Sequence, residues 1–390
     1  MTGLGVAILT YSVKPRGGVV HALNLAEALD RRAEPVHLVA LGDPSAGFFR
    51  EVDVGHTLVA PPEPAETLEE RVFDSVDALA AGLAQNDATR FDIVHAQDCI
   101  AARAALQFRG DRRSPIVVRT VHHVDEFSTP VLVECQRRSI VEPDHVLVLS
   151  DHWRRKLRAD FSVDASIVPT GVDAARFARP PSFDPDALRA RIGANGRFLW
   201  LTVGGIEPRK GSLELMEAFA KVVRARPSAC VLAVVGGHAF QDHAPYRERA
   251  LARAAALGVT EGRDLALLGT VDDAELPSWY HAADAFVFPS VVEGWGIAVL
   301  EALAARLPVV TSDIPVFREY LVAGRDAVLV PPHDPAALAD AMRTVSADAR
   351  LRRRLAEAGP GIAARHTWDG SAAAHAAFYR RVARRAVGGL

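Results

Sequence analysis

Short apolar runs of three to six residues alternate along the first part of the chain with longer segments in which apolar residues recur at every third or fourth position. The short runs are typical of buried strands and are Val6–Thr10, Val36–Ala40, Ile93–His95, Ile116–Val121 and His145–Leu149. The segments between them, such as His21–Leu29 and Ala78–Leu83, have the periodicity of amphipathic helices. Strands that alternate with helices predict an α/β fold with a parallel, doubly wound sheet.

Three prolines in the segment Arg179–Pro185 interrupt the alternation, because proline fits neither a helix interior nor a paired strand. We therefore expect a first domain over residues 1–178 and a second that begins at residue 184. The strand pattern then restarts, at Phe198–Val203, Val231–Val235, Asp264–Leu268, Ala285–Phe288, Val309–Thr311 and Ala327–Val330. Helical periodicity returns at Leu213–Val223, Tyr246–Leu257 and Ser371–Arg384.

Composition fits a globular chain with two domains: 390 residues, of which 49% are hydrophobic and 24% charged. The net charge of −3 gives no basic excess, so nucleic acid is not an expected partner. No apolar run reaches the roughly 20 residues of a membrane span, and the first residues predict a strand rather than a signal peptide. Three widely spaced cysteines indicate neither disulfides nor a zinc site, which fits the cytoplasm.

The clearest functional pattern is a pair of glutamates in FPSVVEGWGIAVLEALAARLPVV, residues 288–310. Glu293 lies in a glycine-flanked loop that opens a helix, and Glu301 lies just over one turn into that helix. Exposed backbone amides at a helix N-terminus favour an anion. We interpret the stretch as a site in which one carboxylate binds sugar hydroxyls, the backbone amides bind phosphate, and the other carboxylate binds ribose hydroxyls. Its candidate donor contacts are Glu293, Gly294, Trp295, Gly296, Ile297 and Glu301.

A second candidate site is VGGIEPRKG, residues 203–211, which follows a predicted strand. Gly205 allows the backbone to approach a ligand closely. Arg209 and Lys210 place positive charge where a leaving diphosphate develops negative charge. The alternative is a basic helix start on a solvated surface.

The first domain also has polar residues directly after its strands, where open parallel sheets bind ligands. Gly17 and Gly18 offer amides in the first strand-to-helix turn, after Lys14. His122 ends another strand and is suited to a hydrogen bond with a sugar hydroxyl. The remaining candidates of this domain are His123, as an alternative to His122, and Asp98. Two such sheet edges that face each other would form an interdomain cleft.

Together these motifs resemble the retaining family-4 (group 1) glycosyltransferases, whose signature is two glutamates separated by seven residues. The similarity continues through DIVHAQD, RTVHH and VPTGVDAARF to HTWDGSAAAHAAFYRRV. It implies the GT-B fold of two facing Rossmann-like domains, with the C-terminal helix, 371–390, packed on the acceptor-binding first domain. The donor-binding domain would then be 184–370.

The resemblance also implies an activity: transfer of a sugar from a nucleotide-sugar to an acceptor hydroxyl with retention, without a cofactor or an obligatory metal. Arg209 and Lys210 would bind the donor diphosphate, and Glu293 and His122 would hold the sugar. Gly18 would face donor phosphate, while Lys14, Gly17, Asp98 and His123 are candidate acceptor contacts. Trp295 stands where the family commonly has phenylalanine, and a larger ring would narrow the sugar pocket.

Rival interpretations remain at this point. A GT-B sugar phosphorylase or nucleotide-sugar epimerase would share the fold, and a glycosidase would use both glutamates but has no use for an Arg-Lys pair. An inactive nucleotide-sugar-binding protein would be expected to lose charged motif residues. The acceptor is left open as a small molecule, a glycan or a lipid-linked molecule. The basic segment Trp153–Arg158, with Arg137 and Arg138, is either a weak peripheral membrane contact or a solvated face.

Overall fold

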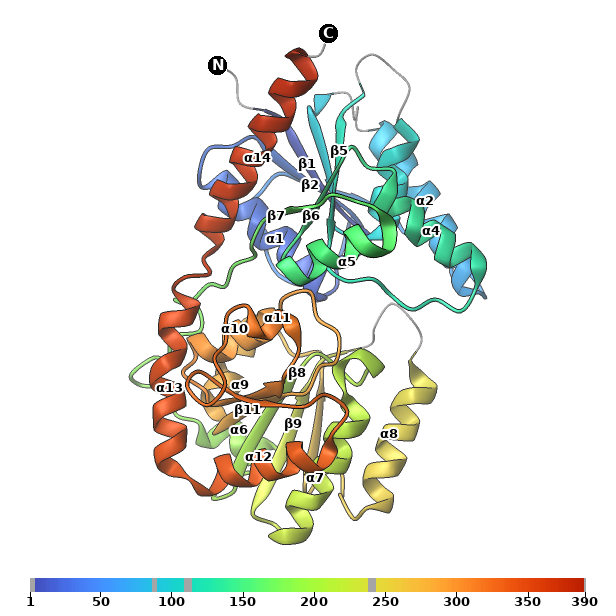
Figure 1. Cartoon of the computed structure of the whole chain (residues 1–390). Coiled ribbons are helices and arrows are strands. Elements are labelled where there is room, and N and C mark those ends of the chain that lie inside the picture. The colour runs from blue at the N-terminus through green and yellow to red at the C-terminus, as the bar shows by residue number, and fades with distance from the viewer. Residues whose placement is uncertain (1–3, 86–89, 109–113, 238–242, 389–390) are drawn as a thin grey trace. The chain divides into compact units, whose positions relative to one another are not determined.

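The computed structural model describes residues 4–85, 90–108, 114–237 and 243–388, which divide into two compact units (Figure 1). Unit 1 consists of Met1–Gly171 and Trp368–Leu390, and unit 2 consists of Val172–Thr367. Unit 2 is therefore one continuous stretch of chain, whereas unit 1 is completed by the C-terminal segment.

Unit 1 is built on a parallel sheet of seven strands in the order β3-β2-β1-β4-β5-β6-β7. The strands are β1 (Val6–Thr10), β2 (Val36–Leu41), β3 (His56–Val59), β4 (Ile93–Ala96), β5 (Ile116–Val121), β6 (His145–Val148) and β7 (Ser166–Ile167). The chain order reverses between β1 and β4, and ligands of such sheets bind beyond the strand ends at that point. Residues 11–18 and Gln97–Asp98 follow these two strands.

Helices flank the sheet of unit 1 (Figure 1): α1 (Gly17–Asp30), α2 (Leu68–Gln85), α3 (Cys99–Ala105), α4 (Pro130–Val141), α5 (Asp151–Phe161) and α14 (Trp368–Gly388), with a 3-10 turn at Leu106–Phe108. The long helix α14 packs against α1. Arg31 of the α1 C-cap forms an ion pair with Asp369 at 3.0 Å, and Arg380 pairs with Glu34. The C-terminal helix is thus an integral part of unit 1.

Unit 2 contains a second parallel sheet, in the order β10-β9-β8-β11-β12-β13. Its strands are β8 (Phe198–Val203), β9 (Cys230–Val235), β10 (Leu265–Gly269), β11 (Ala285–Phe288), β12 (Val309–Ser312) and β13 (Val328–Val330). Its helices are α6 (Asp186–Arg191), α7 (Ser212–Ala225), α8 (Ala244–Ala256), α9 (Leu276–Ala282), α10 (Ile297–Ala304), α11 (Pro315–Arg318), α12 (Pro335–Ala347) and α13 (Ala349–Ala363), with a 3-10 turn η3 (Pro208–Lys210). Here the order reverses between β8 and β11.

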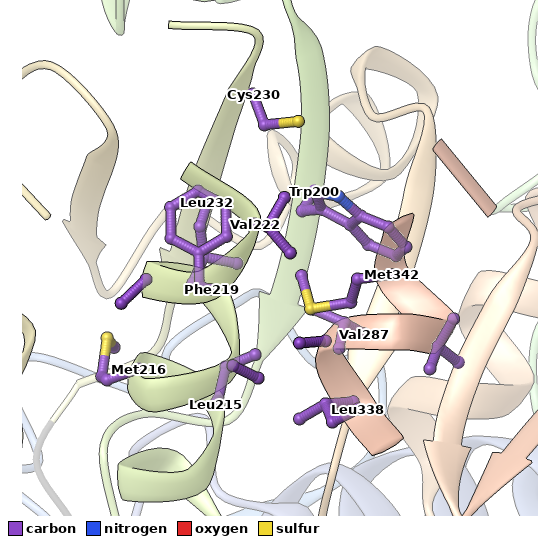
Figure 2. Close-up of a cluster of buried hydrophobic side chains, with 14 of the residues drawn as sticks. Trp200, Leu215, Met216, Phe219, Val222, Cys230, Leu232, Val287, Leu338 and Met342 are labelled. Atoms are coloured by element: carbon purple, nitrogen blue, oxygen red, sulfur yellow. The ribbon is translucent and has the colours of Figure 1, made fainter. Parts of the chain in front are cut away.

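One face of the unit 2 sheet is covered by α7 and α12, and the apolar contacts between them form the core shown in Figure 2. Leu215 and Phe219 extend from α7 toward Trp200 and Leu232 of the central strands, all at most 3% exposed. Met342 of α12 completes the cluster. These residues explain the apolar periodicity of Leu213–Val223, and they hold β8 and the loop after it in place.

The structure confirms the predicted strands to within two residues at either end and adds two. Neither β3 nor β7 carries a strong apolar pattern, because β3 is a partly exposed edge strand and β7 has only two residues. The proline-rich segment 179–185 lies inside unit 2. There the rings of Phe183 and His281 meet edge to face, with 5.3 Å between their centroids. Among the described residues, no helix is long and apolar enough to cross a membrane.

Candidate active site

The loop between β11 and α10 is shaped by aromatic side chains beneath it. Gly296 has a φ of 88°, and a Cβ on it would lie 2.6 Å from the ring of Phe317, so only glycine fits here. Trp295 stacks on Tyr320 with 5.0 Å between ring centroids, and the Tyr320 hydroxyl donates to the Trp295 carbonyl at 3.0 Å. The indole of Trp295 is therefore packed inside unit 2, and the residue is only 7% exposed.

Glu293 is a buried carboxylate at the centre of a cluster of charges. Its Oε1 accepts from Lys210 Nζ at 2.5 Å and from Ser290 Oγ at 2.7 Å, and lies 3.4 Å from Arg209 Nη1. Burial alone would raise the pKa of Glu293, but the two cations lower it below the usual value. The carboxylate is therefore ionised and paired, as a buried charge must be.

The cations come from the loop after β8, which is joined to the loop after β11. The Arg209 carbonyl accepts from Val291 N at 2.9 Å, and Arg209 Nε lies 3.1 Å from Glu207 Oε2. Gly205 has a φ of 76°, and a Cβ on it would lie 2.9 Å from the Gly237 carbonyl. A pocket beside the loop after β8 is lined by Gly204, Gly205, Lys210, Ser212 and Phe288, among others. Positive side chains thus contact Glu293, in the loop that leads into α10, at the reversal point of this sheet.

Glu301 lies in the second turn of α10, facing the core. Its Oε2 accepts from the Tyr280 hydroxyl at 2.7 Å, and Tyr280 is fully buried on α9. Burial raises the pKa of Glu301 to about 7, against the opposing effects of Tyr280 and Arg176. A buried carboxylate needs a hydrogen-bond partner, and Tyr280 supplies one for Glu301. The burial of Glu301 is therefore not by itself evidence for a ribose at this position.

In unit 1, Gly17 and Gly18 begin α1, after the exposed Lys14. His122 lies beside Gly18: a Cβ on Gly18 would be in van der Waals contact with the imidazole Cδ2, at 3.6 Å. At Gly17, where the helix starts, the described residues place no atom within 4 Å of an added Cβ, apart from the chain neighbours and the backbone of α1. Arg16, the residue at the N-cap position of α1, contacts the Tyr11 hydroxyl with its side chain.

His122 follows β5 and belongs to a buried network. Its Nε2 lies 3.1 Å from Gln97 Oε1, and its ring meets His21 edge-on at 5.0 Å. Burial, and then Arg119, lower the pKa of His122 well below the usual value, so the ring is neutral near pH 7. His123 pairs instead with Asp125 at 3.3 Å.

Asp98 forms two backbone hydrogen bonds. It caps α3 by accepting from Ala101 N at 2.8 Å, and it accepts from Tyr11 N at 2.9 Å. These hydrogen bonds hold the loop after β1 and the start of α3, so Asp98 has a structural role. The acceptor contact predicted for Asp98 from the sequence stays a prediction.

Three positions in these networks were assigned no role in the sequence analysis: Tyr280, Ser290 and Gln97, the last of which stands where the resembled family often has a second histidine. Each acts on a predicted residue, namely Glu301, Glu293 and His122. Ser290 lies only three residues before Glu293, so their hydrogen bond could have been predicted from the local sequence. Tyr280 and Gln97 approach their partners from other elements.

The basic segment on α5 is ion-paired along its length. Trp153 is 3% exposed and packs into unit 1. Arg154 and Arg155 both contact Asp151, and Lys156 contacts Asp160 at 2.7 Å. On α4, Arg137 and Arg138 pair with Glu134 and Glu142. These contacts fit the solvated-face interpretation of the segment.

Comparison with known proteins agrees with this architecture. The chain matches the family model "Glycosyltransferase Family 4" over residues 15–176 and "Glycosyl transferases group 1" over residues 185–361. A solved sucrose-phosphate synthase from Thermosynechococcus elongatus superimposes with a TM-score of 0.80 at 21% identity, covering 97% of this chain and 99% of that one. The two α/β units therefore define a GT-B fold.

Two curated relatives give the family. The chain is 31% identical to a phosphatidyl-myo-inositol mannosyltransferase from Mycobacterium tuberculosis, over 96% of each sequence. It is 30% identical to a GDP-mannose-dependent alpha-(1-6)-phosphatidylinositol monomannoside mannosyltransferase from Mycolicibacterium smegmatis, over 68% of each. The chain belongs to the family-4 (group 1) glycosyltransferases and is a glycosyltransferase.

Proposed function

We propose that this enzyme transfers a sugar from a nucleotide-diphosphate sugar to an acceptor hydroxyl with retention of anomeric configuration and without a metal ion or other cofactor. The observation that carries the proposal is the cluster of Lys210, Arg209 and Glu293 in the loops that lead into α10. Two cations near the start of a helix would suit a diphosphate, and Glu293, which contacts both cations, would meet the sugar attached to that diphosphate.

Donor binding would exchange partners within this cluster. The diphosphate would contact Arg209 and Lys210, the amides of residues 294–297 and the backbone at Gly205. Glu293 would then be released from Lys210 to accept hydrogen bonds from sugar hydroxyls. Glu301 would accept from the ribose hydroxyls. Because the cations already carry the charge that the leaving group needs, the residues supply a substitute for a metal ion.

The chemical step that we propose uses no protein nucleophile. The bond between the anomeric carbon and the diphosphate oxygen breaks, and the acceptor oxygen bonds to the same face of that carbon. The acceptor's proton passes to an oxygen of the leaving diphosphate. His122 in unit 1, a neutral imidazole, would hydrogen-bond to a substrate hydroxyl.

The relatives suggest which substrates to test first. One is described as GDP-mannose-dependent, and both act on phosphatidylinositol or its mannoside. We propose mannose from GDP-mannose as the transferred group and a lipid-linked inositol as the acceptor.

Thermal denaturation with GDP-, UDP- and ADP-sugars, each with and without EDTA, tests the donor site. A ligand at one hundred times its dissociation constant stabilises the folded state by about 2.7 kcal/mol. We expect stabilisation by GDP-mannose that EDTA does not change and that Glu301→Ala loses. An absence of stabilisation with every nucleotide-sugar would contradict the proposal.

Transfer itself is tested with labelled GDP-mannose and vesicles that contain phosphatidylinositol. We expect label in the lipid fraction and an anomeric carbon of unchanged configuration by NMR. An inverted product would rule out the mechanism while leaving the transferase activity in place. Transfer to a soluble inositol phosphate but not to the lipid would correct the acceptor.

A further inference from the structure

A line of buried polar side chains in unit 1 connects α14 to His122. The Tyr379 hydroxyl lies 2.7 Å from His95 Nδ1, and Thr120 Oγ1 lies 2.7 Å from His95 Nε2. The amide of Gln97 lies between the two imidazoles: its Nε2 is 3.2 Å from His95 Nε2, and its Oε1 is 3.1 Å from His122 Nε2. Tyr379, His95, Thr120 and Gln97 are each at most 2% exposed.

The surroundings of Gln97 determine which end of its amide faces which ring. Both ring nitrogens of His95 already have hydroxyl partners, and Gln97 Nε2 lies within 3.4 Å of both nitrogens. The single ring N–H of His95 is directed to one of these hydroxyl oxygens, so the Gln97 amide meets the electron-rich face of the imidazole, where an amino group is favourable and a carbonyl oxygen is not. The carbonyl oxygen of Gln97 therefore faces His122. Because that oxygen can only accept, His122 must donate from Nε2.

His122 has a single ring proton to place. Burial and the neighbouring Arg119 keep the imidazole neutral by lowering its pKa. If the proton is on Nε2, Nδ1 is an acceptor. The Cδ2–Nε2 edge of the ring lies beside Gly18 and Gln97, so Nδ1 is on the opposite edge.

We propose that Gln97 is a positioning residue, which holds His122 in the tautomer protonated at Nε2 and so presents Nδ1 as an acceptor to a substrate hydroxyl. The assignment deepens the proposed function and rests on it, because the hydroxyl belongs to the transferred sugar or to the acceptor. Gln97 itself touches His122 and not the substrate. Its own orientation is fixed by His95, which Thr120 and Tyr379 hold from two sides.

The tautomer can be measured directly in the full-length protein. Long-range ¹H–¹⁵N spectra of ¹⁵N-histidine-labelled enzyme distinguish protonated from unprotonated ring nitrogens, and His122→Asn identifies the signals. We expect the wild-type His122 to carry its proton on Nε2. Gln97→Met, which has a similar volume and no acceptor of comparable strength, should lose that preference. Gln107→Met, at an exposed glutamine bonded to Asp77, should leave the spectrum unchanged.

The kinetic consequence is expected in turnover rather than in nucleotide binding. Gln97→Met should lower kcat about tenfold, the effect of losing one oriented hydrogen bond in the transition state. Stabilisation by GDP should be unchanged, because the proposed diphosphate contacts lie in unit 2. Gln107→Met should match the wild type in both measurements.

Two results would overturn the proposal. One is a wild-type spectrum with the His122 proton on Nδ1, which needs no variant to fold. The other is a Gln97→Met enzyme that has lost the tautomer but transfers sugar at the wild-type rate. Failure of the proposed function is recognised separately, since the wild type would then transfer no sugar while the spectrum still reports the tautomer.

Discussion

At the scale of single residues, Glu293 and Lys210 form the pair on which the candidate donor site depends. Each is mostly buried, with side-chain exposures of 8% and 12%. Removing one partner of such a pair leaves an uncompensated buried charge, which costs about 3–5 kcal/mol. We expect Lys210→Met to destabilise unit 2 by about that amount, and Lys210→Met combined with Glu293→Gln to be less destabilised than Lys210→Met alone.

Urea unfolding of the two single variants and the double variant measures this coupling. Lys221→Met, at an exposed lysine on α7, is the matched control and should leave stability within about 0.5 kcal/mol of the wild type. Additive losses in the double variant would show that the two charges do not depend on each other.

Glu301 gives the protein a pH dependence of known sign. Its pKa is raised from 4.5 to about 7, so the folded state binds the proton more tightly than the unfolded state does. The stability that this group contributes is fully present below about pH 4.5 and is lost as the pH rises through 7. At one to two pH units above the folded pKa, the free energy of unfolding is lower by about 3 kcal/mol than it is at low pH, as far as this group is concerned.

We expect Glu301→Gln to gain stability relative to the wild type as the pH rises from 5 to 8, by denaturant unfolding at each pH. Tyr280→Phe should move the wild-type transition to higher pH, because the tyrosine hydrogen bond lowers the carboxyl pKa. Parallel stability profiles for wild type and Glu301→Gln would refute the raised pKa.

At the scale of elements, the start of α10 depends on Gly296. Its φ of 88° disfavours any side chain, and a Cβ would contact Phe317 at 2.6 Å. We expect Gly296→Ala to destabilise the protein by about 1–3 kcal/mol and to weaken donor binding, because the amides at the helix start would move. Gly361→Ala is the matched control: that glycine lies exposed inside α13, and nothing in the described part of the chain beyond its neighbours and its own helix backbone lies within 4 Å of an added Cβ. It should be neutral or stabilising, by thermal denaturation.

The same scale shows what the sequence could and could not predict. Buried central strands were predictable because most of their residues are apolar, whereas β3 and β7 expose part of theirs. The residues of the two loops in unit 2 were predictable because each follows a strand directly. The contacts of Glu301 with Tyr280 and of His122 with Gln97 were not, because each joins residues more than 20 apart in the chain. Pattern and spacing locate a residue on an element, but only packing determines its partner.

At the scale of the whole molecule, the two units differ in how they depend on the chain. Unit 2 is continuous from Val172 to Thr367 and contains Arg209, Lys210, Glu293 and Glu301. Unit 1 needs α14, which contributes Tyr379 and His375 to its core. We therefore expect residues 172–367 expressed alone to fold and to be stabilised by GDP as the full chain is, but to transfer no sugar.

Circular dichroism and thermal denaturation of this fragment, with and without GDP, test whether unit 2 folds and binds the nucleotide on its own. Its Lys210→Met variant is the control and should lose the stabilisation. A complementary chain that ends at residue 367 should have a destabilised unit 1, because the face of α1 that packs on α14 would be exposed to water. If the fragment folds and GDP does not stabilise it, residues of unit 1 must complete the nucleotide site, and donor recognition would then be a property of the whole chain rather than of unit 2.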